Sequence, residues 1–134
     1  THGIVSGSPE SAVESGLTSV FFPHGIGHLL GLMVHAAAGF AAGPNGGVRE
    51  KPEGHPYLRL TRDLEPGFVV TIEPGIYFID SLLEQARADK RGRAIDWKRV
   101  EALRPWGGIR IEDNVVAQAG SPRNLTREAF SASA

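Results

Sequence analysis

Three histidines lie close together in an apolar, glycine-rich segment, FFPHGIGHLLGLMVH. They are His24, His28 and His35. Imidazole is neutral near pH 7 and is the commonest nitrogen ligand of metal ions. His24 and His28 have the i, i+4 spacing of a helical metal pair, but the two glycines between them predict an irregular turn. The segment is a candidate metal site, and the alternative is a loop whose histidines are only hydrogen-bonded.

A carboxylate lies inside the most strand-like segment of the chain. Glu73 sits between Ile72 and Pro74 in TIEPGIY. Burying a carboxylate is costly, so a buried Glu73 is expected to be paired, hydrogen-bonded or metal-bound. Strand alternation could instead point it at solvent. Pro74 and Gly75 weaken that alternative, because they already interrupt regular strand pairing.

A second charged group lies in GGIRIEDNVV. Strand alternation places Arg110 and Glu112 on one face, with Asp113 on the other face or beginning a bulge. Such a pair is often a solvated surface pair, but here it is flanked by apolar residues and glycines. With one imidazole and Glu73, Glu112 completes a ligand set that suits Mn, Fe(II), Co or Zn. Two such ions bridged by carboxylates would form a hydrolytic site with an unspecified substrate.

Composition excludes several other classes of protein. The 134 residues fit one small domain, and 14 basic against 15 acidic residues argue against nucleic-acid or polybasic membrane binding. The chain has no cysteine, which excludes a disulfide scaffold and a cysteine nucleophile and fits the cytoplasm. No apolar run is long enough for a membrane span, so no membrane association is expected.

The elements that must position these residues indicate an α+β fold. The residue pattern predicts a helix at residues 8–14 capped by Ser8, a helix at residues 81–89 capped by Ser81, a helix at residues 96–103 and a helical turn from residue 126. It predicts strands at residues 18–22, 58–62, 68–79, 109–111 and 114–117, with a bend at Pro74. The glycine-rich residues 23–47 cannot form one regular helix, and residues 43–56 are expected to be a polar loop.

Several motifs occur together in an order that resembles a known family. They are FFPHGIGHLLGL with VH, then YLR, LEPG, TIEPGIYFID, WKRVEALRP and GGIRIEDNVV. In this the chain resembles the pita-bread metallopeptidases, and within them the bacterial Xaa-Pro dipeptidases (prolidases). The resemblance covers nearly the whole chain. It implies metal-dependent hydrolysis of Xaa-Pro dipeptides by a hydroxide that bridges two divalent ions. The metal expected from the resemblance is Mn, and Co, Zn and Fe are the alternatives.

The resemblance also implies a role for each motif residue. His28, Glu73 and Glu112 match metal ligands; Glu73 also matches the proton shuttle, and Glu112 a bridge between the two ions. His24 and His35 match histidines that line the site and assist the substrate or intermediate.

Two arginines complete the implied site. Arg110 matches an arginine that hydrogen-bonds around the ligands. Arg59, in YLR, matches a residue proposed to hold the C-terminal carboxylate of the dipeptide, a task that suits a bidentate guanidinium.

The chain departs from the family pattern at two points. Ala36 stands where the family usually has an aspartate after the third histidine, which removes a carboxylate expected to orient His35. Two aspartate ligands of the family, with the N-terminal domain and the first half of the catalytic domain, have no counterpart here. Residues 1–134 are therefore expected to be the C-terminal half of a pita-bread catalytic domain, inactive in isolation and homodimeric in the full-length family. Alternatives are a non-catalytic binding or interaction module, and organophosphate hydrolysis as a side activity.

Overall fold

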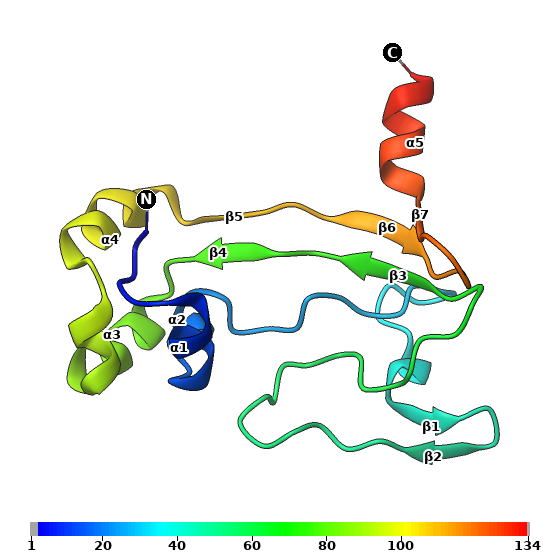
Figure 1. Cartoon of the computed structure of the whole chain (residues 1–134), viewed down its shortest axis with the longest axis horizontal. Coiled ribbons are helices and arrows are strands. Elements are labelled where there is room, and N and C mark those ends of the chain that lie inside the picture. Colours follow the sequence, from blue (N-terminus) through cyan, green and yellow to red (C-terminus); the bar gives the residue numbers. More distant parts are fainter. Residues whose placement is uncertain (1–2, 134) are drawn as a thin grey trace. The chain divides into compact units, whose positions relative to one another are not determined.

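The computed structural model describes residues 3–133, which fall into two compact units (Figure 1). Unit 1 consists of Thr1–Pro23 and Gly75–Arg110, and unit 2 consists of His24–Pro74 and Ile111–Ala134. Each unit therefore combines two separate stretches of the chain. Both contain helices and strands, which confirms the predicted α+β class. Within residues 3–133, no helix has the length and apolar character needed to cross a membrane.

Unit 1 is mainly helical. Its elements are α1 (Pro9–Glu14), α2 (Thr18–Phe21), β4 (Gly75–Tyr77), α3 (Asp80–Ala88), the 3₁₀ helix η2 (Lys90–Ala94), α4 (Trp97–Leu103), the 3₁₀ helix η3 (Arg104–Trp106) and β5 (Gly108–Arg110). Two helices begin as predicted. The Ser8 side chain accepts a hydrogen bond from the first turn of α1, and the Asp96 side chain does the same for α4.

The helices of unit 1 enclose one apolar core. Its buried residues are Ala12, Leu17, Val20, Phe21, Leu83, Ala86, Ile95 and Val100. Phe21 also meets Phe78 edge to face, with ring centroids 6.1 Å apart. The N-terminal segment is fastened to this core because the Asp96 N–H donates to the Ile4 carbonyl at 2.8 Å.

Two predictions in unit 1 are wrong. Residues 18–21 form helix α2 instead of a strand, because Leu17, Val20 and Phe21 follow the i, i+3, i+4 spacing that buries one helical face. Ser81 does not cap α3. That helix begins at Asp80, after Ile79, and no side chain caps its first turn.

Unit 2 is built on a three-stranded antiparallel sheet in the order β3–β6–β7. Its elements are η1, a 3₁₀ helix (Ala37–Phe40), β1 (Ala41–Gly43), β2 (Gly46–Val48), β3 (Val69–Ile72), β6 (Asp113–Val116), β7 (Arg123–Asn124) and α5 (Leu125–Ala132). β3 and β6 run side by side, with Val69 opposite Val116 and Ile72 opposite Asp113 (Figure 1). The predicted helical turn from residue 126 is thus part of α5, which begins one residue earlier.

An extended segment lies along the other edge of β3. The Thr71 N–H donates to the His28 carbonyl at 2.9 Å, and the Glu73 N–H donates to the Ile26 carbonyl at 2.7 Å. Gly27 permits this approach, since a Cβ there would lie 1.8 Å from the Thr71 carbonyl oxygen. β3 is therefore hydrogen-bonded on both edges by parts of unit 2.

The predicted strand at residues 68–79 is divided as expected. β3 ends at Ile72 and β4 begins at Gly75, so Glu73 and Pro74 form the break. Proline has no N–H to donate, which explains why pairing stops there.

Two other predictions in unit 2 are wrong. Residues 58–62 form no strand; the N–H groups of Thr61 and Arg62 both donate to the Gly39 carbonyl, at 2.9 and 3.1 Å, so no ladder forms. Residues 43–56 are not one loop, because β1 and β2 pair as a hairpin around Pro44 and Asn45. The proline and asparagine supply a tight turn.

Candidate metal centre

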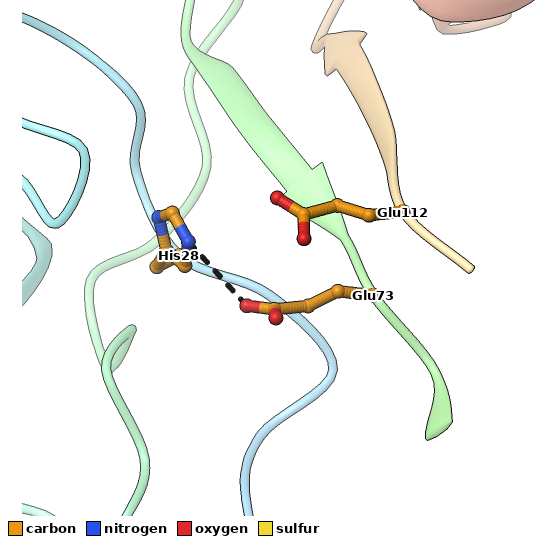
Figure 2. A group of neighbouring side chains, drawn as sticks. All are labelled: His28, Glu73 and Glu112. Atoms are coloured by element: carbon orange, nitrogen blue, oxygen red, sulfur yellow. Dashed lines mark ion pairs between the residues drawn. The ribbon is translucent and has the colours of Figure 1, made fainter. Parts of the chain in front are cut away.

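His28 is held with one ring nitrogen directed at the candidate site. The residue is only 3% exposed, and its N–H donates to the Thr71 hydroxyl at 3.0 Å. Its Nδ1 lies 3.1 Å from the Leu29 carbonyl oxygen. Because a carbonyl only accepts, Nδ1 carries the hydrogen and donates it. The Nε2 atom is thereby left to act as a ligand toward Glu73 (Figure 2).

Glu73 lies at the break after β3 and is buried, with 7% of its surface exposed. Its Oε1 is 3.4 Å from the His28 Nε2. The Thr71 hydroxyl donates to the same oxygen at 3.4 Å, so the prediction that Glu73 is buried and partnered is confirmed and the solvent-facing alternative is wrong. The position follows from local structure, because Pro74 ends the strand and the Glu73 N–H is fixed to the Ile26 carbonyl.

Glu112 reaches the same place from the neighbouring segment. It lies between β5 and β6, directly before Asp113, which pairs with Ile72. The Ile111 N–H donates to the Pro74 carbonyl at 3.2 Å, so the backbone is held on both sides of Glu112. Antiparallel pairing therefore sets Glu112 beside Glu73, and both carboxylates turn toward His28 (Figure 2). The Glu112 side chain is exposed, unlike the other two.

The three side chains are chemically suited to a divalent cation. One ligand atom from each of His28, Glu73 and Glu112 lies within 4.8 Å of the others. Two carboxylates and an imidazole lone pair repel one another at this range, and a cation between them removes the repulsion. The group fits a metal ion rich in oxygen ligands.

His35 adjoins the three residues. Its ring meets the His28 ring nearly at right angles, with centroids 4.4 Å apart. The pKa of His35 lies below its usual value although the residue is exposed, first because neighbouring groups exclude some water from its ring and then because positively charged Arg59 is near. Glu73 and Glu112 oppose this shift. The lowered pKa favours the neutral imidazole of His35. The charge of Arg59 is felt at this ring, so Arg59 lies near the same site.

His24 and Arg110 are the remaining predicted residues. His24 is half-buried, outside the three-ligand group, and its Nδ1 is 2.8 Å from the Gly25 carbonyl oxygen. The irregular turn predicted between His24 and His28 is confirmed, since neither lies in a helix.

Arg110 ends β5 and belongs to unit 1. Gly75 with Arg110 and Ile72 with Asp113 pair in one continuous register, which supports the prediction that Arg110 and Glu112 lie on the same face. Ala36 donates its N–H to the Leu29 carbonyl at 3.2 Å and offers no side-chain oxygen to His35.

Thr71 is a polar residue of the site that the sequence did not lead us to predict. Thr71 is 1% exposed, accepts the His28 N–H and donates toward Glu73 at 3.4 Å. The signal was present, because Thr71 and Glu73 are two residues apart and share one face of a strand.

Comparison with known proteins defines the class. The model of metallopeptidase family M24 matches residues 3–119. The chain belongs to this family of metallopeptidases.

Individual relatives narrow the comparison. The Xaa-Pro dipeptidase of Xanthomonas axonopodis pv. citri is 60% identical over 130 residues, covering 97% of this chain and 30% of the relative. The Xaa-Pro dipeptidase of Stenotrophomonas maltophilia is also 60% identical over 130 residues, covering 97% of this chain and 29% of the relative. The chain thus spans about 30% of the length of these curated relatives.

Solved structures support the same fold. Proline aminopeptidase P II from Yersinia pestis matches with a TM-score of 0.52 and 29% identity, over 95% of this chain and 22% of that one. The low-pH form of aminopeptidase P from E. coli matches with a TM-score of 0.54 and 28% identity, over 94% and 21% respectively. The predicted pita-bread fold class is confirmed by these similarities.

Proposed function

We propose that this chain supplies three ligands, His28, Glu73 and Glu112, to a dinuclear metal centre that hydrolyses Xaa-Pro dipeptides. The observation that carries the proposal is the convergence of the Nε2 of His28 with two carboxylates in a chain 60% identical to Xaa-Pro dipeptidases. A pair of divalent ions, when bound, would activate water and polarise the carbonyl before proline.

Each ligand has a distinct task in this proposal. Glu73 is the proton carrier, since its buried carboxylate lies beside the site and can pass a proton to the leaving nitrogen. Glu112, the exposed member of the group, is the ligand that the resemblance assigns to both ions. His28 binds through Nε2 because Nδ1 is engaged with the Leu29 carbonyl.

The other predicted residues are proposed to handle the dipeptide. A neutral His35 can donate or accept a hydrogen bond at the reacting carbonyl, and its contact with the His28 ring supports this. Arg59 would bind the C-terminal carboxylate of the dipeptide. This role is supported by the position of Arg59, whose charge acts on His35 beside the site. His24 and Arg110 are assigned supporting roles by resemblance alone.

The proposal also covers the metal, the cellular location and the oligomeric state of the enzyme. Manganese is proposed as the metal, because two carboxylates and one imidazole form an oxygen-rich set. The cytoplasm is the proposed location, on the support of a sequence without cysteine. A homodimer is proposed for the full-length enzyme from its resemblance to prolidases, and size-exclusion chromatography with light scattering would test it.

The chain by itself is predicted to be inactive on dipeptides. Within residues 3–133, the metal-binding group found comprises three residues, fewer than two ions require. A direct assay of the 134-residue chain with Gly-Pro and manganese would check this, and turnover at ordinary enzyme rates would contradict it.

A chimera tests the proposed activity. The matching segment of the Xanthomonas axonopodis Xaa-Pro dipeptidase is replaced with this chain, and Gly-Pro hydrolysis is measured with manganese. We expect hydrolysis, and its loss when Glu73→Gln is introduced. Glu84→Gln, at an exposed position on α3, is the matched control and should leave hydrolysis unchanged. A chimera that folds and binds manganese without hydrolysing the dipeptide would refute the activity and favour the binding-module alternative.

A further inference from the structure

We propose that Thr71 is a positioning residue of the metal centre, whose hydroxyl orients the Glu73 carboxylate against the His28 imidazole. The inference rests on the proposed function, because it concerns the same ligands. Thr71 is not a member of the three-residue group. It acts through the two ligands that it connects.

The direction of each hydrogen bond at the Thr71 hydroxyl follows from its partners. The His28 N–H can only donate, so Oγ1 accepts from it at 3.0 Å. A hydroxyl has one hydrogen of its own, which remains available for the Oε1 of Glu73 at 3.4 Å. An ionised carboxylate can only accept, so this second bond has a single possible direction. One hydroxyl therefore connects the backbone of one ligand to the side chain of another.

The oxygen that Thr71 contacts is the one that faces the imidazole. Oε1 of Glu73 lies 3.4 Å from the Thr71 hydroxyl and 3.4 Å from the Nε2 of His28. A donor fixed on this oxygen restricts rotation of the carboxylate about its terminal bond, which is otherwise a broad torsion. At 3.4 Å this hydrogen bond is longer than the usual O–H···O range of about 2.5–3.0 Å, so the hydroxyl contributes orientation more than binding energy.

The hydroxyl itself is firmly located. Thr71 is 1% exposed, so water has little access to replace it. Its β-branched side chain restricts the first torsion angle. Its N–H is bonded to the His28 carbonyl at 2.9 Å, and Gly27 packs against its carbonyl oxygen. A group fixed in this way is suited to hold a ligand in one orientation.

Two substitutions separate the hydroxyl from the shape of the side chain. Thr71→Val keeps the branched shape and removes the hydroxyl, whereas Thr71→Ser keeps the hydroxyl. Thr126→Val is the matched control, because the Thr126 hydroxyl also accepts a backbone N–H, that of Asn114 at 2.8 Å, in the same unit. Thr126→Val removes a similar hydrogen bond to a backbone N–H but leaves the Thr71 hydroxyl that donates to Glu73.

The test measures manganese affinity by isothermal titration calorimetry on the 134-residue chain, with circular dichroism to follow folding. We expect Thr71→Val to weaken manganese binding about 10- to 100-fold, as substitution of a partner of a metal ligand does. Thr71→Ser should retain the wild-type affinity, and so should Thr126→Val.

Equal affinity of Thr71→Val and the wild type would overturn the role of Thr71. Equal losses in Thr71→Val and Thr126→Val would overturn it too, by showing a general structural effect. Should Thr71→Val not fold, Thr71→Ala is compared with Thr71→Ser in the same way. Failure of the wild-type chain to bind manganese would instead overturn the proposed centre together with this role, so the two failures can be told apart.

Discussion

Gly27 offers a sharp test of how the candidate site is built. In Gly27→Ala the added Cβ would lie 1.8 Å from the Thr71 carbonyl oxygen, whereas real Cβ contacts are essentially never below 3.0 Å. The segment that carries His28 must therefore move away from β3 by about 1.2 Å or more. That movement breaks or weakens the bonds from Thr71 N–H to the His28 carbonyl and from Glu73 N–H to the Ile26 carbonyl.

The expected cost of Gly27→Ala follows from these losses. Two weakened hydrogen bonds contribute about 1–3 kcal/mol to the loss of unfolding free energy, and overpacking adds about 1–3 kcal/mol. The free energy of unfolding should therefore fall by about 2–6 kcal/mol. Manganese affinity should fall as well, because His28 and Glu73 are no longer held together.

Urea denaturation followed by circular dichroism measures the first effect, and isothermal titration calorimetry measures the second. Gly120→Ala is the matched control, since a Cβ there meets no atom within 4 Å and its φ is not positive. It should change the unfolding free energy by no more than about 1 kcal/mol, in the stabilising direction. If Gly27→Ala behaves like Gly120→Ala in both assays, the close approach of the two backbones is refuted.

Three further outcomes follow from other parts of the chain. Glu112→Gln should weaken manganese binding in calorimetry while changing the thermal stability of the metal-free chain little, because Glu112 is exposed; a large loss of stability would contradict this. The Arg49 guanidinium, through hydrogen bonds and charge, holds the pKa of Asp63 below its usual value, so this pair stabilises the fold at neutral pH. The contribution is lost as the pH falls through the lowered pKa, and denaturation of Arg49→Gln and the wild type should converge in acid. Val100→Ala should lower the unfolding free energy by about 2 kcal/mol, since Val100 is fully buried, whereas the exposed Val13→Ala should change it by less than about 0.5 kcal/mol.

Local chemistry made part of the structure predictable. The caps at Ser8 and Asp96 mark helix starts because their side chains satisfy N–H groups that the first turn leaves free. Glu73 was recognisable because a carboxylate before Pro-Gly, within an apolar strand, sits where pairing must stop. These features depend on neighbours in the sequence alone.

Other features depend on contacts between distant segments. Glu112 reaches Glu73 only because β6 pairs with β3 in a particular register, which the strand pattern of either segment does not specify. The same holds for the contact of His35 with His28 across an irregular loop.

Helix α2 and the β1–β2 hairpin were missed for a different reason. The sequence did contain the helical spacing of Leu17, Val20 and Phe21 and the Pro44–Asn45 turn. Both elements are so short that residue composition does not distinguish helix, strand and loop in them.

We propose above all that His28, Glu73 and Glu112 together bind a divalent metal ion. Anomalous diffraction at the manganese edge, from crystals of the 134-residue chain grown with manganese chloride, tests it most directly. We expect an anomalous peak within bonding distance of the Nε2 of His28 and of a carboxylate oxygen of each glutamate. A map with manganese bound elsewhere on the chain, or with no peak between these three side chains, would contradict it.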